Sequence, residues 1–246
     1  MRSTSYEAVL STGVRFGRCK MENEVRTTLD KRSSSTSQQR IVVTGTGAGV
    51  GKTVFCAGLV NLLGAKFWKP IQAGLEGETD AERVARLASL SPDRIVPERY
   101  RLQTAGWPQC SADIDEVRID ADSLDVPDTE GQPLVIEGTG GLMEPLNCGS
   151  LYIDVLEKWR LPVVFCASTA MGSINCALLS IEALRRRQID ILGIAFVGEK
   201  NSDAVRAICE IGRVRWLGRL PWIAPLAADT LQAAFKASFW RDDFKL

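Results

Sequence analysis

The segment that most constrains this chain is "VVTGTGAGVGKT", residues 42–53. It follows a β-branched run typical of a strand and opens a run, Lys52–Leu63, that predicts a helix. Glycines in such a turn allow backbone N–H groups to point inward, and the helix N-terminus adds partial positive charge. The segment therefore predicts a phosphate-binding loop, with the Lys52 ammonium near the outer phosphates and the Thr53 hydroxyl near Mg²⁺.

The spacing of this loop departs from the commonest pattern, which is Gly, four residues and then Gly-Lys-[Ser/Thr]. Thr46 stands where the first glycine of that pattern belongs, and Gly45 lies one residue earlier. The alternatives are a variant of the same device, a damaged site, or a strand-to-helix turn that binds nothing.

Composition excludes several classes of function. Lys+Arg and Asp+Glu both total 30, so the formal net charge is zero and nothing suggests nucleic acid as a partner. The chain has no histidine, which excludes Ser-His-Asp and Cys-His catalysis and histidine metal sites. Catalysis must then rely on lysines, carboxylates, hydroxyls, backbone amides and a bound metal.

The seven cysteines include no C-x-x-C pair, so neither zinc nor thioredoxin-like spacing is present. Most stand in apolar runs, where a free cysteine is usually a small core residue. We therefore expect a reducing, cytoplasmic location. No apolar run reaches the roughly 18 residues of a membrane helix, so we expect no membrane association.

Residues 1–39 differ from the rest. "KRSSSTSQQR", residues 31–40, is polar and serine-rich, which favours a disordered N-terminal extension. A transit peptide is an alternative, but acidic residues such as Glu7 and Asp30 disfavour it. Another alternative is that translation begins at Met21. We expect residues 40–246 to form a single domain.

From residue 40 onward, short apolar segments alternate with segments of helical periodicity. The predicted strands span residues 40–45, 65–70, 132–138, 161–167, 190–198 and 214–221, and the predicted helices span residues 52–63, 78–90, 150–160, 172–187, 202–212 and 226–239. This alternation predicts an α/β fold with three layers, in which helices cover both faces of a mostly parallel sheet. Thr79 and Glu82 form a capping-box pattern at one helix start, and Gly212 is expected to end another helix.

Several polar residues follow predicted strands, where ligands bind in such sheets. Lys69 ends one apolar segment and Glu137 ends another, while Asp80 begins a helix. Carboxylates at these places are typical ligands for nucleotide-bound Mg²⁺. Lys69 as a solvated lysine and Asp80 as a helix cap remain alternatives.

Four segments in order, "GTGAGVGKT", "KPIQAG", "EGTGG" and "GSINCA", resemble the motifs of the dethiobiotin synthetase family. The resemblance covers about residues 41–226. It identifies the loop spacing as a family variant: Gly, five residues, then Gly-Lys-Thr. It also implies a homodimer with the P-loop NTPase-like fold, using Mg²⁺ and ATP to convert 7,8-diaminononanoate and CO₂ to dethiobiotin, ADP and phosphate in biotin synthesis.

The resemblance also assigns roles to residues. It implies catalytic roles for Lys52 and Lys69, and Mg²⁺ ligation by Thr53, Asp80 and Glu137. The implied nucleotide-binding residues are Gly49, Val50, Gly51, Lys52, Thr53, Glu137, Gly138, Gly198 and Pro221. The implied substrate-binding residues are Lys69, Ala73, Gly140 and Gly141, together with Ser173 and Asn175 across the dimer. From the residues alone, Ser173 and Asn175 could equally cap their helix.

The chain departs from the family pattern at four places. Gly47 replaces an Asp, Ala73 replaces a Ser, and "WPQ", residues 107–109, replaces Ser-Pro-His. Gly198 and Glu199 stand where the family has Asn-Asp, and the Asn reads adenine. That last change leaves the base preference open.

Three other functions are alternatives. A MinD/ParA-like switch ATPase would share the fold, but it would carry a second lysine in the loop, which "GTGAGVG" lacks. Amidoligases of the cobyrinate or CTP-synthesis class usually carry a glutaminase domain, which needs a histidine. A diverged paralogue would bind nucleotide without synthesis. The C-terminal "LQAAFKASFWRDDFKL" is expected to pack on the core rather than on a membrane.

Overall fold

The computed structural model describes residues 39–170 and 172–246. The extension expected to be disordered, which includes Cys19, lies outside these residues except for Gln39. Met171 lies outside them as well. Gln39 is part of the folded body, because its carbonyl accepts a hydrogen bond from Leu134 N at 2.8 Å.

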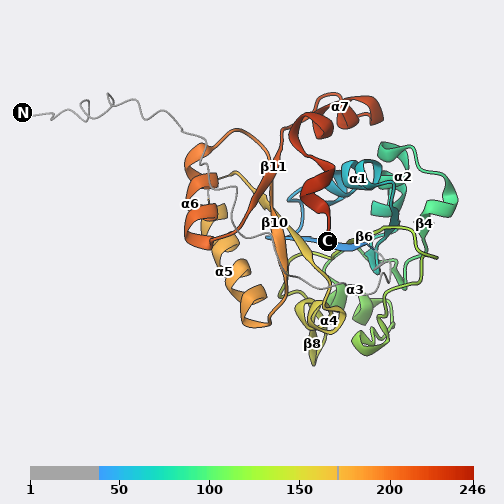
Figure 1. Cartoon of the computed structure of the whole chain (residues 1–246). Helices are drawn as coiled ribbons and strands as arrows, with labels where there is room; N and C mark the ends of the chain where they lie inside the picture. Colours follow the sequence, from blue (N-terminus) through green and yellow to red (C-terminus); the bar gives the residue numbers. More distant parts are fainter. Residues whose placement is uncertain (1–38, 171) are drawn as a thin grey trace, which may run out of the picture. The chain divides into compact units, whose positions relative to one another are not determined.

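A seven-stranded sheet forms the centre of the molecule, in the order β11-β10-β9-β1-β6-β2-β4 (Figure 1). Every neighbouring pair in this sheet is parallel. Its strands are β1 (Arg40–Gly45), β2 (Lys66–Trp68), β4 (Ile95–Val96), β6 (Leu134–Glu137), β9 (Val163–Ser168), β10 (Ile191–Val197) and β11 (Trp216–Leu220). All six predicted strands are confirmed, within a few residues at their ends.

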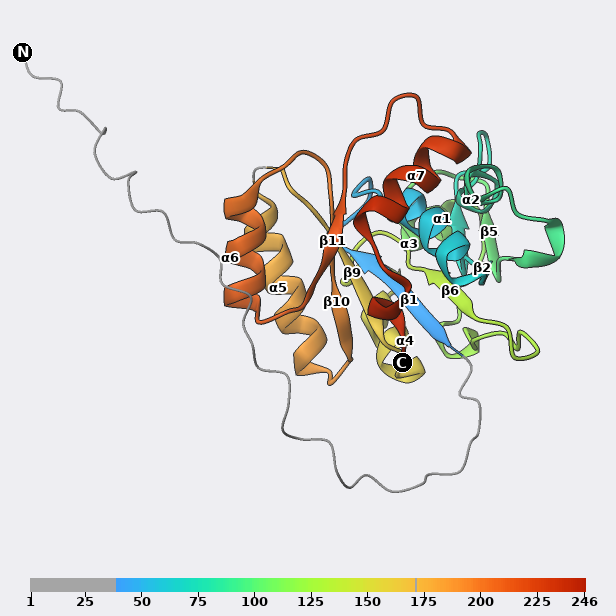
Figure 2. The same cartoon turned by 45° about the horizontal axis from the view of Figure 1, so that its top comes forward.

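Side-chain alternation along the strands creates two cores, one on each face of the sheet. In β1, Ile41 and Val43 belong to the core beneath one set of helices, α1 (Lys52–Leu63), α2 (Asp80–Ala88) and α7 (Ala228–Ser238). Val42 belongs to the core beneath the other set, α3 (Pro108–Ile114), α4 (Tyr152–Trp159), α5 (Ser173–Arg186) and α6 (Ser202–Gly212). Figure 2 shows these two helical layers on either side of the strands. The result is a three-layer α/β arrangement with helices on both faces of a parallel sheet, as predicted.

All six predicted helices, which are those other than α3, are confirmed, and each end lies within two residues of the prediction. The predicted capping box starts α2: Thr79 Oγ1 accepts from Glu82 N, and the Glu82 carboxylate accepts from Thr79 N. Helix α6 ends at Gly212, as predicted, and Arg213 adopts the left-handed conformation beyond it, with φ 45°.

The sequence patterns did not predict the shortest elements. Helix α3 begins where "WPQ" stands, with Trp107 at the N-cap position and Pro108 as its first residue. Two small sheets flank the main one: β3 (Ile71–Ala73) pairs in parallel with β5 (Tyr100–Leu102), and β7 (Pro145–Asn147) pairs antiparallel with β8 (Ser150–Leu151). The 3₁₀ helices are η1 (Pro92–Arg94), η2 (Ala121–Ser123) and η3 (Arg241–Phe244).

The C-terminal segment packs on the core, as predicted. Phe235, Phe239 and Phe244 are buried around Phe55 of α1, with the Phe55 and Phe235 ring centroids 5.3 Å apart. No helix in the described residues is both long and apolar enough to cross a membrane.

The prediction that the cysteines are mostly core residues is wrong for three of those described. Cys56 and Cys166 are buried and Cys209 is intermediate, but Cys110, Cys148 and Cys176 are exposed. All six described cysteines are free thiols.

The order of the strands places the conspicuous motifs at one edge. The strands that follow β1 in the sequence, β2, β4 and β6, lie on one side of β1 in the sheet, whereas β9, β10 and β11 lie on its other side. The direction of winding therefore reverses beside β1, and this is the topological switch point. Parallel sheets bind ligands at the carboxyl ends of the strands at such a point. The glycine-rich loop follows β1 there, Lys69 follows β2, and Glu137 ends β6.

Candidate active site

The glycine-rich loop requires glycine at two positions by its backbone geometry. Gly49 and Gly51 have φ of 71° and 96°, in the left-handed region that disfavours other residues. At Gly51 a Cβ would also lie 2.8 Å from Val197 Cγ1, so the loop can approach β10 only without a side chain. Gly51 is the N-cap residue of α1, and no side chain caps that helix start. The backbone N–H groups at the start of α1 are therefore suited to bind an anion.

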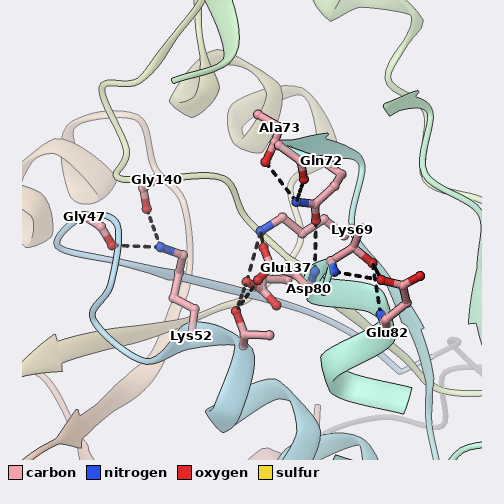
Figure 3. A network of polar contacts seen from close by, with 12 residues as sticks. Gly47, Lys52, Lys69, Gln72, Ala73, Asp80, Glu82, Glu137 and Gly140 are labelled. Atoms are coloured by element: carbon pink, nitrogen blue, oxygen red, sulfur yellow. Dashed lines mark hydrogen bonds and ion pairs between the residues drawn. The ribbon is translucent and has the colours of Figure 1, made fainter. Parts of the chain in front are cut away.

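Lys52 joins this loop to the loop that follows β6 (Figure 3). Its Nζ donates to the carbonyl oxygens of Gly47 at 2.8 Å and Gly140 at 2.7 Å. Burial lowers the pKa of Lys52, and the nearby Glu137 carboxylate opposes that shift. A lysine held only by neutral carbonyls can turn toward phosphate oxygens, which are stronger acceptors.

Lys69 is buried and paired with two carboxylates. Its Nζ contacts Asp80 Oδ2 and lies 3.1 Å from Glu137 Oε1. Burial acts to lower the pKa of Lys69, but the two carboxylates outweigh it and raise the pKa above the ordinary value. Lys69 is therefore charged, and the alternative of a solvated lysine is wrong.

Thr53, Asp80 and Glu137 converge as a set of oxygen donors. Thr53 Oγ1 lies 3.0 Å from Asp80 Oδ1 and 2.8 Å from Glu137 Oε1. Burial raises the pKa of Glu137, and Lys69 opposes this. Asp80 is also affected by burial, which acts to raise its pKa, but the pairing with Lys69 prevails and the pKa is lowered.

This donor set fits a hard divalent cation. Glu137 Oε2 is buried and has no hydrogen-bond partner, so one carboxylate oxygen is available to a cation. Asp80 is not the helix cap, because Thr79 has that role. The described residues contain no group of three or more His, Cys, Asp or Glu side chains able to hold a metal by themselves. Asp80 and Glu137 supply two carboxylates, and Mg²⁺ typically takes one or two carboxylates plus substrate phosphates.

Gln72 is a site residue that the sequence patterns did not reveal. Its side chain is buried, and its Oε1 accepts from Asp80 N at 3.1 Å while its Nε2 donates to Ala73 O at 3.0 Å and Gly74 O at 3.4 Å. Gln72 thus fixes the segment carrying Ala73 to the start of α2. The sequence signal available for Gln72 was an amide residue in the short segment between Lys69 and Gly74.

Gly138, Gly140 and Gly141 form the turn after β6. Gly138 N donates to Val43 O at 2.9 Å, and Gly141 pairs with Thr46 in an isolated bridge. The turn therefore lies directly against the glycine-rich loop, in which Val50 is buried.

Gly198 and Pro221 follow neighbouring strands β10 and β11. Gly198 N donates to Leu220 O at 3.0 Å, and its carbonyl accepts from Arg219 Nη1 at 2.7 Å. A Cβ at Gly198 would lie 2.7 Å from Thr169 Oγ1. Gly198 also has φ 124°, a backbone conformation that disfavours any residue with a side chain.

Ser173 and Asn175 lie outside the polar network around Lys52 and Lys69. Gly172 is the N-cap residue of α5, and no side chain caps it, so the capping alternative is wrong. Ser173 Oγ is buried without a partner, and Asn175 is exposed.

This chain is similar to known proteins over most of its length. A family model described as an AAA domain matches residues 39–230. An "ATP-dependent dethiobiotin synthetase BioD" from Bradyrhizobium diazoefficiens is 65% identical over 206 residues, covering 84% of this chain and 98% of the relative. One from Rhodopseudomonas palustris is 62% identical over 205 residues, covering 83% and 98%.

Among solved structures, the MinC:MinD cell division protein complex of Aquifex aeolicus has a TM-score of 0.47 at 15% identity, covering 81% of this chain and 94% of that one. The cell division ATPase MinD of Pyrococcus furiosus has a TM-score of 0.48 at 13% identity, covering 80% and 97%. Nothing about function follows from similarities this low.

Proposed function

The chain belongs to the dethiobiotin synthetase family, and we propose that it converts 7,8-diaminononanoate, CO₂ and ATP to dethiobiotin, ADP and phosphate. The observation that carries the proposal is the cluster at the carboxyl edge of the sheet. There Lys69 lies between Asp80 and Glu137, beside the loop that carries Lys52. Such a cluster suits the transfer of a phosphoryl group to a small anionic substrate.

The chemistry demands charge control more than proton transfer. One amine of the substrate must be unprotonated to capture CO₂ as a carbamate. A carbamate oxygen then attacks the γ-phosphate of ATP, giving a carbamic-phosphoric anhydride and ADP. The second amine attacks the carbonyl carbon, closes the ureido ring and expels phosphate. Holding both amines beside one carbonyl makes the closure effectively unimolecular.

The lysines would neutralise charge that gathers on the transferred group. Lys52, now bound to the carbonyls of Gly47 and Gly140, would turn to the phosphates. Lys69 follows β2 on the other side of the carboxylates, where we assign it to the carbamate and the γ-phosphate. The turn at Gly140 and Gly141 would line the diamine site with backbone groups, and Ala73 would lie beside it.

We assign Mg²⁺ to Thr53, Asp80 and Glu137, whose oxygens converge. When bound there it supplies positive charge that neutralises the phosphate oxygens of ATP. The nucleotide would lie along residues 49–53, Glu137 and Gly138, with its base toward Gly198 and Pro221.

We also propose that the chain acts as a homodimer in a reducing cytosol. Support for the dimer comes from α5, where Ile174 is 37% exposed and Leu179 is 59% exposed near Ser173 and Asn175. In a dimer, the start of α5 would meet the carboxylate end of the partner's substrate. Support for the cytosol comes from the exposed free cysteines, Cys110, Cys148 and Cys176.

The test is to incubate the purified chain with the diamine, bicarbonate, Mg²⁺ and each NTP in turn, and to measure dethiobiotin by mass spectrometry. We expect product with ATP, and the comparison of NTPs measures base preference. ATP hydrolysis without product would instead favour a switch ATPase. Nucleotide binding without turnover would favour a diverged paralogue.

A further inference from the structure

We propose that Glu144 binds the cationic end of the substrate, so that its carboxylate selects the diamine. The inference rests on the proposed function and adds a residue to that site. Glu144 was not among the candidate residues found from the sequence. Its position relative to Gly140 and Gly141 carries the proposal.

The backbone N–H and the backbone carbonyl of Glu144 are both hydrogen-bonded. Glu144 N donates to Gly141 O at 3.4 Å, and Glu144 O accepts from Tyr152 N at 2.9 Å. Tyr152 is itself almost completely buried. The side chain then folds back over the turn, where Glu144 Oε1 accepts from Gly141 N at 3.3 Å.

The carboxylate lies on the same turn that holds Lys52. Gly140 has φ 45°, and a Cβ built there would be 2.4 Å from both Cγ and Oε1 of Glu144. The carbonyl of the same Gly140 accepts from Lys52 Nζ at 2.7 Å. The next residue, Gly141, faces the glycine-rich loop, since its Cβ position is 3.5 Å from Gly47 Cα. Glu144 therefore stands beside the place where phosphate and diamine are expected to meet.

The carboxylate of Glu144 is free to take a cation. Among the described residues it enters no ion pair, and its single hydrogen bond, at 3.3 Å, is long. Asp80 and Glu137 differ, because both are engaged by Lys69. Glu144 is also partly exposed, so a ligand can reach it.

A cationic amine needs such a group at this site. Lys52 and Lys69 both lie near the expected substrate position and repel an ammonium group. A carboxylate on the glycine turn offsets that repulsion and gives a charge-assisted hydrogen bond. Position 47, where the family pattern has Asp, offers no carboxylate in this chain.

The test is the variant Glu144→Gln, whose amide oxygen can still accept from Gly141 N. We expect the KM for the diamine to rise by about 10- to 100-fold, the usual effect of losing a charge-assisted hydrogen bond. The KM for ATP should stay within about threefold, because Glu144 contacts the turn and not the nucleotide loop directly. Glu130→Gln is the matched control, since Glu130 is exposed on the turn before β6, at the opposite end of that strand. A diamine KM within twofold of wild type in Glu144→Gln would overturn the proposal.

Inhibition by substrate analogues gives a second readout. The monoamines 7-aminononanoate and 8-aminononanoate, and nonanoate itself, are compared as inhibitors of the wild type and of Glu144→Gln. In Glu144→Gln, inhibition by at least one monoamine should weaken by the same factor as the rise in KM for the diamine. Inhibition by nonanoate should be unchanged. Equal weakening of nonanoate would mean that the turn is damaged, and would overturn the assignment. A wild type that forms no dethiobiotin would refute the proposed function itself, whereas an active wild type with unchanged variant kinetics would refute only the role of Glu144.

Discussion

At the residue scale, the site is a balance of buried charges. Lys69 offsets Asp80 and Glu137, while Lys52 is held by two carbonyl oxygens and no carboxylate. A nucleotide and Mg²⁺ that enter this site would replace the present partners of Lys52 and Lys69 in a site that is already charged. Each lysine can therefore be tested separately.

Replacing either lysine by alanine removes a preorganised positive charge. We expect Lys52→Ala or Lys69→Ala to lower kcat by about 10²-fold or more. Lys69→Ala should also destabilise the protein, because it leaves two carboxylates without their cation. Steady-state rates and thermal melting separate the two effects, and Lys66→Ala in β2 is the control. Wild-type rates in both site variants would contradict these roles.

Glu137→Gln tests the proposed metal site. The amide keeps the shape of the side chain but loses the charge of the buried carboxylate, whose Oε2 has no partner. We expect the Mg²⁺ concentration for half-maximal rate to rise about tenfold or more, as even indirect partners of a metal contribute that much. Titration of activity with Mg²⁺ measures this. An unchanged requirement for Mg²⁺ would show that Glu137 is not a ligand.

Gly47→Asp tests the most conspicuous departure in the loop. A Cβ at Gly47 would meet nothing within 4 Å, so an aspartate fits without displacing neighbours. We expect the melting temperature to change little, since substitutions that disturb no packed contact usually alter stability by less than about 0.5 kcal/mol. In the Glu144→Gln background, Gly47→Asp should restore most of the lost affinity for the diamine. The KM of the double variant, compared with that of Glu144→Gln, decides this.

At the element scale, short segments place the long ones. Strand β3 carries Gln72, whose side chain binds the first backbone N–H of α2 and two carbonyls of its own segment. Because α2 begins with Asp80, this amide determines where a proposed metal ligand lies. It also connects Lys69 and Ala73 to the same helix.

Gln72→Leu would leave the partly buried Asp80 N–H without its side-chain acceptor. We expect the free energy of unfolding to fall by about 1–3 kcal/mol, the cost of an unsatisfied buried donor. The Mg²⁺ requirement should increase as well, because Asp80 is no longer fixed. Denaturant unfolding and a Mg²⁺ titration check both effects, with Gln103→Leu in the exposed segment after β5 as control. A stable variant with unchanged Mg²⁺ dependence would argue against a positioning role.

The elements differ in how well the sequence predicts them. Long periodic segments such as Lys52–Leu63 were predicted to the residue, and the rule that parallel strands end together brought Lys69 to Glu137. Elements of a few residues, such as β3 and β7, carry too little periodicity to predict. Gln72 and Glu144 were not predicted, because the loops that bring them to their partners follow a course set by packing and turn geometry.

At the scale of the whole molecule, the fold brings distant segments to one edge. The Lys52–Gly140 and Lys69–Glu137 contacts join residues 88 and 68 positions apart. The site therefore depends on the complete sheet and its covering helices. The helix that follows the glycine-rich loop, α1, is held from outside by the C-terminal aromatic cluster of Phe55, Phe235, Phe239 and Phe244.

Phe235 packs this cluster against α1, and its removal should lower the stability of the whole protein. Phe235 stacks on Phe239 with centroids 4.5 Å apart, and a Cβ at Gly58 would come within 2.1 Å of the Phe235 ring. We expect Phe235→Ala to lower the free energy of unfolding by about 3–5 kcal/mol, as for other buried aromatics. Lys236→Ala, on the exposed side of the same helix, should have little effect.

Gly58→Ala supplies a coupled test of the same contact. Alone, the added methyl group collides with the Phe235 ring, so the variant should be destabilised despite the better helix propensity of alanine. In the Phe235→Ala background the methyl enters the space that the ring has left. Denaturant unfolding of the two single variants and the double variant should therefore give a double-variant loss smaller than the sum of the single losses. Simple additivity would mean that α1 and α7 are not packed against each other at this point, and that the C-terminal segment does not hold the helix that follows the phosphate loop.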